Sequence, residues 1–266
     1  MLDFVTNNEL AVRLLSFLLV LKTFIFMERV FPKRPIKLRK IRWLNNFSLV
    51  AFNSLALRIV ALSIAIDAAT FASSHNIGLF NIIETNIVAT VIMSIILLDL
   101  AIYWQHRLMH IIPVFWRLHQ VHHSDIEYDI STGLRFHPVE IILSYLFKYL
   151  LVLLIGAPMV AIIIFEIILN ATAMFNHSNL KIPLKVDKIL RLFIVTPDMH
   201  RVHHSINRKE TDRNYGFNIP LWDYIFKSYT AQPKDGHQNM LIGVDKFRSS
   251  KQQQFLQLLA QPIRNE

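Results

Sequence analysis

The chain has 266 residues, of which 53% are hydrophobic and only 18% are charged. Soluble domains are about 45–50% apolar and about 25% charged, so this composition excludes a disordered chain or a collagen-like repeat and favours a membrane protein. The absence of cysteine excludes disulfides and thiolate metal sites. The 28 Lys and Arg against 19 Asp and Glu fit nucleic acid, anionic lipid or the cytoplasmic side of a membrane, and the placement of the charges decides among these.

Long apolar runs divide the chain into candidate membrane-spanning helices. The last run is too long for one span of about 20 residues, and Gly156-Ala157-Pro158 in its middle is a turn signal. It is therefore predicted to form two helices folded back on each other. No strand-type alternation competes with these runs. We expect an all-α integral membrane bundle of about four to five spans, built from the runs 10–27, 47–66, 87–103 and 139–175.

The placement of Lys and Arg predicts the orientation in the membrane. Residues 59–106 contain neither Lys nor Arg, whereas basic residues crowd the loop after the first run. Because short loops rich in positive charge remain on the cytoplasmic side, this loop is predicted to be cytoplasmic, solvated and facing lipid headgroups. Alternation of the spans then places residues 176–266 on the same side. The basic residues of the loop are Arg29, Lys33, Arg34, Lys37, Arg39, Lys40 and Arg42.

Three regions follow from this reading. Residues 1–97 are expected to hold transmembrane helices and the basic loop, residues 98–230 a region that contains the hairpin 139–175 and most of the histidines, and residues 231–266 a C-terminal cytoplasmic tail. The small size of the chain favours a bacterial inner membrane over the endoplasmic reticulum, with the histidine-rich part of the chain on the cytoplasmic side.

Nine of the twelve histidines fall into four groups on the predicted cytoplasmic side. Residues 106–110 read HRLMH, residues 119–123 and 200–204 each contain the pattern HxxHH, and His177 stands alone. Side chains at positions i, i+3 and i+4 share one face of a helix. Each HxxHH is therefore predicted to aim three rings at one point.

The number of histidines predicts a metal centre. Neutral imidazole is a common ligand of zinc, copper, iron and nickel, and a tetrahedral ion takes about four ligands. Nine histidines therefore predict two ions, and no catalytic residue is expected beyond the ligands. The predicted ligands are His106, His110, His119, His122, His123, His177, His200, His203 and His204.

Further residues are candidates for supporting this centre. A ligating histidine usually donates its second ring N–H to a carboxylate or a carbonyl. Asp99 lies within a span, where an acidic side chain is a functional candidate, and its alternative role is an ion pair with Arg107. The supporting candidates are Asp99, His137, Asp198, Asp212 and Asn214.

The ordered motifs resemble the fatty acid hydroxylase (sterol desaturase) superfamily of integral-membrane, histidine-rich di-iron enzymes. The similarity covers roughly residues 98–229, and the gap between the first two histidine motifs is too short for the membrane hairpin that acyl-chain desaturases place there. The motifs are YWQHRLMH at 103–110, HQVHHS at 119–124, RFHPVE at 135–140, NHSN at 176–179, TPDMHRVHHS at 196–205 and DRNYG at 212–216.

This resemblance implies a non-haem enzyme with two Fe ions that uses O2 and two electrons to hydroxylate or desaturate a sterol, a fatty acyl chain or a related lipid. It also implies that the nine histidines listed above are the ligands and that zinc can occupy the metal positions in purified protein. The electrons are expected from a separate donor, such as a cytochrome b5-like protein, a ferredoxin or a reductase.

Other functions remain open at this stage. A lipid desaturase of the same superfamily fits the same motifs, and a zinc-dependent membrane hydrolase would use Asp198 or Glu140 as general base. A metal transporter would need ligands through to the outer face, where only His75 lies. No nucleic-acid module is recognisable, so nucleic acid is not an expected partner. The aromatic residues that flank the motifs either line a lipid pocket or form an aromatic belt, and they are Trp104, Trp116, Phe136 and Phe175.

Overall fold

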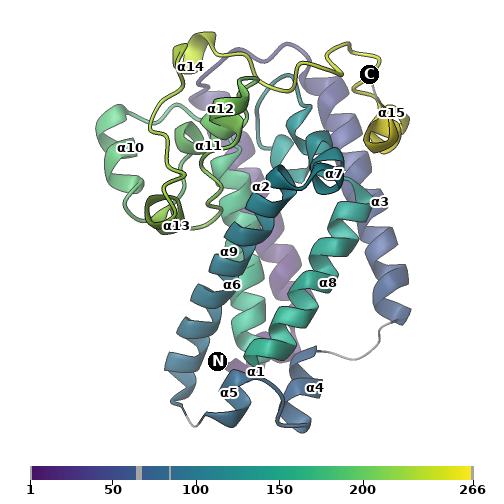
Figure 1. The fold of residues 1–266 in the computed structure, drawn as a ribbon, viewed down its shortest axis with the longest axis vertical. Coiled ribbons are helices and arrows are strands. Elements are labelled where there is room, and N and C mark those ends of the chain that lie inside the picture. The colour runs from purple at the N-terminus through teal and green to yellow at the C-terminus, as the bar shows by residue number, and fades with distance from the viewer. Residues whose placement is uncertain (1, 64–67, 84, 265–266) are drawn as a thin grey trace.

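The computed structural model describes residues 2–63, 68–83 and 85–264, and every regular element in these residues is a helix. Long helices stand side by side in the lower part of the molecule, and short helices form a cap above them (Figure 1). The described residues contain two isolated β-bridges, Pro32 with Leu180 and Ser205 with Ile242. The predicted all-α helical bundle is confirmed.

The chain starts at the foot of the bundle and ends in the cap (Figure 1). The bundle contains α1 (Leu2–Asn7), α2 (Glu9–Val30), α3 (Arg39–Ser63), α4 (Ala68–Ser74), α5 (Leu79–Ile82), α6 (Ile87–Ile111), α8 (Pro138–Ile155) and α9 (Met159–Asn176). The cap contains α7 (Pro113–His123), η1 (Thr132–Leu134), α10 (Leu184–Leu190), α11 (Pro197–His203), α12 (Arg208–Thr211), α13 (Leu221–Ile225), α14 (Gly236–Asn239), α15 (Phe255–Ala260) and η2 (Gln261–Ile263).

Four of the described helices are long and apolar enough to cross a membrane, namely α2, α6, α8 and α9. They correspond to the first run, the third run and the hairpin predicted from the sequence. Helix α3 covers the second run as far as Ser63 but is not among the four. The last residues of that run, 64–66, lie outside the described residues. The chain is therefore an integral membrane protein.

Local sequence explains the hairpin of α8 and α9. His137 accepts a hydrogen bond from the backbone N–H of Val139 through Nδ1 at 3.2 Å, and Pro138 occupies the first helical position, where no N–H is needed. Gly156 ends α8 with φ of 69°, a left-handed conformation that glycine adopts without steric cost. Pro158 then precedes α9. The predicted turn at these residues is confirmed.

Charged side chains within the bundle pair with one another. Arg13 of α2 and Lys148 of α8 both form ion pairs with Glu166 of α9. Arg13 also contacts Glu9 one turn earlier, at 3.2 Å. Because an unpaired charge inside a membrane is costly, these contacts hold the three helices in register.

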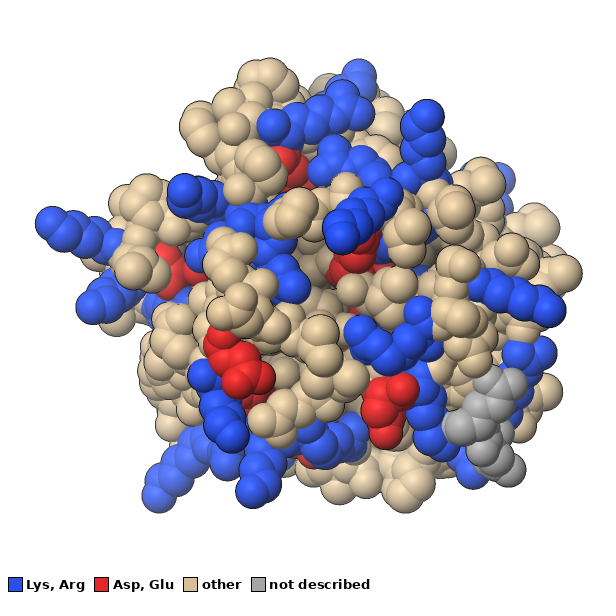
Figure 2. Space-filling view, turned by 90° about the horizontal axis from the view of Figure 1, so that it is seen from above, with Lys and Arg blue, Asp and Glu red and all other residues tan. Residues whose placement is uncertain are grey.

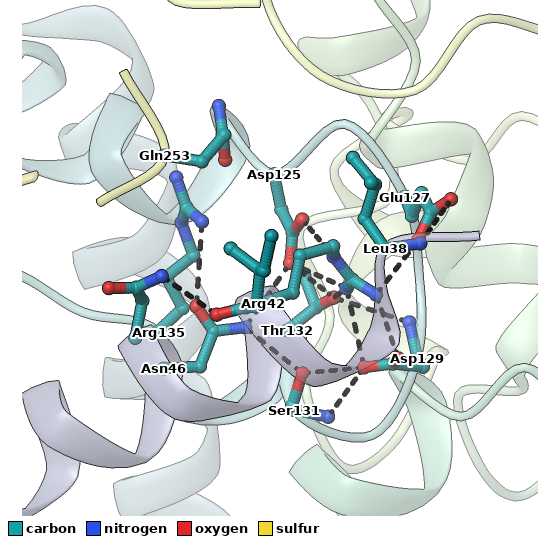
Figure 3. A network of polar contacts seen from close by, with 12 residues as sticks. Leu38, Arg42, Asn46, Asp125, Glu127, Asp129, Ser131, Thr132, Arg135 and Gln253 are labelled. Carbon is teal, nitrogen blue, oxygen red and sulfur yellow. Dashed lines mark hydrogen bonds and ion pairs between the residues drawn. The ribbon is translucent and has the colours of Figure 1, made fainter. Parts of the chain in front are cut away.

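Arg42 anchors the cap to α3 (Figure 3). Its guanidinium lies fully buried, with Nε 2.6 Å from Asp125 Oδ1 and Nη1 2.8 Å from Asp129 Oδ2. Thr132 accepts a further hydrogen bond from Nη2 at 3.1 Å. The network fixes the segment between α7 and α8, which directly follows the second histidine motif at the end of α7. The prediction that the basic loop as a whole faces solvent and headgroups is therefore wrong for Arg42, because a cluster of buried carboxylates binds its charge.

Two more basic residues of the loop depart from that prediction. Lys33 Nζ lies 2.6 Å from Asp198 Oδ2, and Arg34 donates to the carbonyl of Met240 at 3.0 Å. At the end of α2, the buried Glu28 accepts the backbone N–H groups of Ile130 and Asn179. The loop between α2 and α3 therefore packs into the cap instead of lying free above the membrane.

Candidate metal centre

All nine predicted histidines come together in the cap, just above the bundle. Helix α6 carries His106 and His110 on its last two turns, and His177 directly follows α9. The remaining six lie on the short helices α7 and α11 or at the end of α11. All nine side chains are buried, with at most 5% of their surface exposed.

The rings divide into two groups that we name the five-histidine group and the four-histidine group. Within each group, one ring nitrogen from every member lies within 4.8 Å of those of the others. The five-histidine group contains His106, His110, His119, His123 and His203, and the four-histidine group contains His122, His177, His200 and His204.

Each HxxHH motif serves both groups. His119 and His123 of α7 join the five-histidine group, and His122 between them joins the four-histidine group. In the second motif, His200 and His204 join the four-histidine group, and His203 between them joins the five-histidine group. Consecutive residues of a helix point about 100° apart. The prediction that each motif aims three rings at one point is therefore wrong, since only the i, i+4 pair does so.

Backbone carbonyls orient four of the rings. Nδ1 of His106 lies 2.8 Å from the carbonyl oxygen of Tyr215, and Nδ1 of His203 lies 2.7 Å from that of Arg213. Nδ1 of His122 lies 3.2 Å from the carbonyl oxygen of Arg135, and Nδ1 of His177 lies 2.8 Å from that of Ala173. A carbonyl oxygen only accepts hydrogen bonds, so Nδ1 carries the proton and Nε2 presents a lone pair.

Carboxylates orient two more rings. Nδ1 of His119 lies 2.6 Å from Glu140 Oε1, and Nδ1 of His110 lies 3.3 Å from Asp212 Oδ1. The second oxygen of Asp212 pairs with Arg208 Nε at 2.9 Å. These contacts leave Nε2 of both histidines directed into the five-histidine group.

Buried ring nitrogens lie close together in both groups. Among the described residues, Nε2 of all five members of the five-histidine group is buried without a hydrogen-bond partner. In the four-histidine group, Nε2 of His177 lies 3.1 Å from Nε2 of His122, 3.0 Å from that of His200 and 3.2 Å from that of His204. Because His122 and His177 both present lone pairs, this approach is repulsive unless a cation lies between them. Nitrogens that bind one ion at about 2.1 Å lie roughly 3 Å apart, and the spacing around His177 agrees with this. The five-histidine group fits an ion because its converging Nε2 atoms are buried and have no other partner among the described residues.

The protonation state agrees with ligation. Burial lowers the pKa of His122, His200 and His204 well below 6.5, and the neighbouring imidazoles lower it further. The rings are therefore neutral at pH 7, and a neutral ring nitrogen is the form that binds metal.

Of the supporting candidates, Asp212 contacts a histidine of the centre and the other four are engaged elsewhere. Asp99 accepts a hydrogen bond from Trp222 at 2.7 Å, and His137 begins α8. Asp198 binds Lys33 and Arg201. Asn214 donates to the carbonyl oxygens of Met199 and Thr230, both at 2.8 Å.

Glu140 is the supporting residue that the sequence reasoning missed, having been considered there only as a hydrolytic base. It follows the RFHP motif at the first turn of a membrane-spanning helix, and that position was the available signal. The carbonyl oxygens that hold the other rings have no signal in the sequence. Tyr128 was missed as well, and its ring stacks on His177 with centroids 5.8 Å apart.

An apolar cavity of about 410 Å³ lies beside the five-histidine group, between the bundle helices. His106 and His119 line its upper end, and side chains of α2, α3, α6, α8 and α9 form its walls. Of the four aromatic residues considered, Phe136 lines this cavity and stacks on His122, with centroids 4.5 Å apart. Trp116 faces a different cavity. We name the 410 Å³ cavity the lipid-side pocket.

Comparison with known proteins gives a family and several relatives. Human alkylglycerol monooxygenase is 32% identical over 139 residues, which cover 50% of this chain and 29% of the relative. The ornithine lipid hydroxylase OlsE of Rhizobium tropici is 28% identical, covering 65% of this chain and 50% of the relative. Human lathosterol oxidase is 26% identical, covering 85% and 73%.

The chain thus spans less than a third of the human alkylglycerol monooxygenase. No solved structure matches the chain. The sequence profile described as fatty acid hydroxylase matches residues 91–228, just over half of the chain, and this segment includes all nine histidines. The resemblance seen in the motifs is confirmed, and the chain belongs to the fatty acid hydroxylase family.

Proposed function

We propose that the protein is an O2-dependent lipid hydroxylase that works with two iron ions. The observation that supports this most strongly is the set of nine buried imidazoles whose ring nitrogens converge in two groups beside an apolar cavity. The alkylglycerol monooxygenase, ornithine lipid hydroxylase and lathosterol oxidase among its relatives all carry names of lipid-oxidising enzymes.

The five-histidine group would hold one ion and the four-histidine group the other. When bound, two irons would supply the redox chemistry that activates O2 against an unactivated C–H bond. Nitrogen ligands alone disfavour calcium and magnesium, which prefer oxygen. Zinc fits the same ligands and could replace iron in purified protein.

The chain itself positions the substrate and excludes water. The lipid-side pocket is bounded by membrane-spanning helices, so a lipid tail would enter from the bilayer and lie along its apolar walls. Gln105 and Ser144, which hydrogen-bond to each other at 2.6 Å, are polar residues in this lining. A tail that lies along the apolar walls would place one of its carbons at the end of the pocket where His106 and His119 lie. A dry pocket of this kind also prevents side reactions.

The alternatives use the same centre differently. A desaturase would remove a second hydrogen from the bound lipid instead of forming an alcohol. For a zinc hydrolase, the two candidate bases are already engaged. Asp198 binds Lys33 and Arg201, and Glu140 binds His119. Hydroxylation is therefore the function that we put forward.

Isotope labelling in membranes tests the reaction. Cells that express the protein would be grown under ¹⁸O2, and their lipids compared by mass spectrometry with those of cells lacking the gene. If the protein is a hydroxylase, one lipid class should gain one ¹⁸O atom. The purified protein should contain two iron ions per chain. A product two hydrogens lighter would identify a desaturase. Lipid cleavage without O2 would overturn the proposal.

We further propose that the cap faces the cytoplasm, in a bacterial inner membrane in preference to the endoplasmic reticulum. Seen from above, Lys and Arg are spread over the cap and Asp and Glu are few (Figure 2), as the positive-inside rule expects of a cytoplasmic face. The chain has no cysteine, so a single Lys246→Cys substitution would provide a unique label. An impermeant maleimide should label this variant in inverted vesicles and not in right-side-out vesicles.

A further inference from the structure

A second cavity opens on the cap, away from the lipid-side pocket. Its volume is about 570 Å³, and the described lining of the two cavities has no residue in common. Among the described residues of its lining, four side chains are cationic and one is acidic. The cations are Arg117, Arg208, Lys246 and Arg264, and the acid is Asp245. We name this cavity the Trp116 pocket after the tryptophan in its wall.

Trp116 separates this pocket from the five-histidine group. Its ring centroid lies 5.0 Å from that of His110 and 5.4 Å from that of His123. On the pocket side, Arg208 stacks over the indole, with Cζ 4.0 Å from the centroid. One side chain therefore contacts both the open pocket and two rings of the centre.

Arg208 adds a second link to the same histidine. It donates to the carbonyl oxygen of His110 at 2.9 Å and pairs with Asp212, whose other oxygen lies against His110 Nδ1. A partner that contacts Arg208 in the pocket is therefore linked to His110 of the five-histidine group through Arg208 and Asp212.

We propose that the Trp116 pocket is the docking site of an acidic one-electron carrier protein, and that Trp116 lies on the path of the electrons to the ion that the five-histidine group would hold. The inference rests on the proposed function. Each turnover converts a C–H bond, O2, two electrons and two protons into C–OH and water, so two carrier molecules are each oxidised by one electron. Since the lipid would occupy the lipid-side pocket, the carrier protein must reach the centre from a different surface.

The charge of the cap selects the partner. Lys and Arg gather over the face seen in Figure 2, and the Trp116 pocket carries a surplus of positive charge. An acidic protein surface is attracted to such a face, and this attraction speeds docking and weakens with salt. A carrier whose redox group lies near an acidic surface would bring that group against Trp116.

Binding tests the docking site without requiring turnover. The soluble domain of a cytochrome b5 would be titrated onto the protein in nanodiscs at 50 and 300 mM salt. The Arg117→Glu/Lys246→Glu double variant should bind at least tenfold more weakly than the parent, with a reduced dependence on salt. The matched control is Lys185→Glu/Lys188→Glu, which reverses two exposed charges on α10 and should bind like the parent. Equal affinity of both double variants would overturn the docking site.

Pre-steady-state kinetics tests the route. With iron loaded, Trp116→Leu should bind the reduced cytochrome with the affinity of the parent but oxidise it at least tenfold more slowly, and Trp116→Phe should recover part of the rate. Iron content, measured alongside, shows that the centre is intact. An unchanged rate in Trp116→Leu would overturn the route. Dithionite-driven turnover of the parent separates the two proposals, because its absence would count against the hydroxylase function while the binding data still decide the docking site.

Discussion

Nδ1 of His119 lies 2.6 Å from Oε1 of Glu140, and both side chains are buried. This contact joins the cap helix α7 to the first turn of the membrane-spanning helix α8. It also fixes the tautomer that leaves Nε2 of His119 available at the end of the lipid-side pocket. A carboxylate in this position makes a ligating histidine more basic and fixes its ring.

Removing this carboxylate should weaken metal binding. Glu140→Ala is expected to lower metal affinity by about 10–100-fold, the usual cost of losing such a partner. Glu140→Gln should retain more affinity, because its amide oxygen still accepts the Nδ1–H. Competition with a chelator, followed by metal analysis, measures both. Equal affinity of Glu140→Ala and the parent would contradict the assignment.

A histidine of the four-histidine group should be needed for metal and turnover together. His122→Ala removes one of four convergent Nε2 atoms, so we expect loss of about one ion per chain and of lipid hydroxylation. His75→Ala is the control, because His75 is exposed and contacts the carbonyl of Phe71 at the other end of the bundle. Retention of both metal and turnover in His122→Ala would show that the site assignment is wrong.

The lipid-side pocket should set the length of the lipid tail. Leu169→Trp places a larger side chain in the wall of this pocket, so products from long chains should decline more than those from short chains. Leu154→Trp makes the same change on an exposed face of α8 and should leave the profile unaltered. Lipid mass spectrometry gives both profiles, and metal content should be the same in both variants. An unaltered profile in Leu169→Trp would place the substrate elsewhere.

The buried ion pair of Arg42 and Asp125 should dominate the stability of the cap. Asp125→Asn leaves the guanidinium with one fewer charged partner, and breaking a buried pair costs about 3–5 kcal/mol of unfolding free energy. Because Asp129 still contacts Arg42, we expect a loss of about 3 kcal/mol. Asp235→Asn, at an exposed position, should change little. Denaturation in detergent measures the difference, and equal stability of the two variants would contradict the prediction.

The same pair should make stability depend on pH below 4. Burial alone would raise the pKa of Asp125, but the charge and hydrogen bonds of Arg42 lower it from 3.8 to about 2. A depressed pKa stabilises the folded state fully above pH 3.8, and this contribution is lost as pH falls toward 2. The stability gap between the parent and Asp125→Asn should therefore narrow by about 2 kcal/mol between pH 5 and pH 2. It should stay constant from pH 5 to pH 8, and a gap that does not narrow in acid would overturn this prediction.

Much of the fold could be predicted because membrane spans obey simple rules of length and hydropathy. The runs that became α2 and α6 were visible, and Gly156 with Pro158 marked the hairpin. Arg42 could not be placed in the same way. Its partners Asp125 and Asp129 lie more than 80 residues away, and a basic residue in a loop gives no sign that it will be buried against them.

The members of the centre could also be predicted, because so many histidines, eight of them at helical spacings, are not accidental. The division of the nine histidines into two groups could not be predicted. The pattern HxxHH places three rings near one face of a helix and does not show which of two ions each ring would bind. The partners of Nδ1 were hidden for another reason. The carbonyls of Tyr215, Arg213 and Ala173 are backbone groups, and their positions depend on the tertiary fold.

The interleaving of the two histidine groups couples their loading. One peptide bond joins His122 to His123, and another joins His203 to His204, with each pair divided between the groups. Binding of an ion to either group fixes the backbone that presents rings to the other group. The second ion therefore binds with a smaller loss of conformational entropy. Metal binding should then be cooperative. When the metal added is half of what would fill both groups, the sample should be a mixture of fully loaded and metal-free molecules.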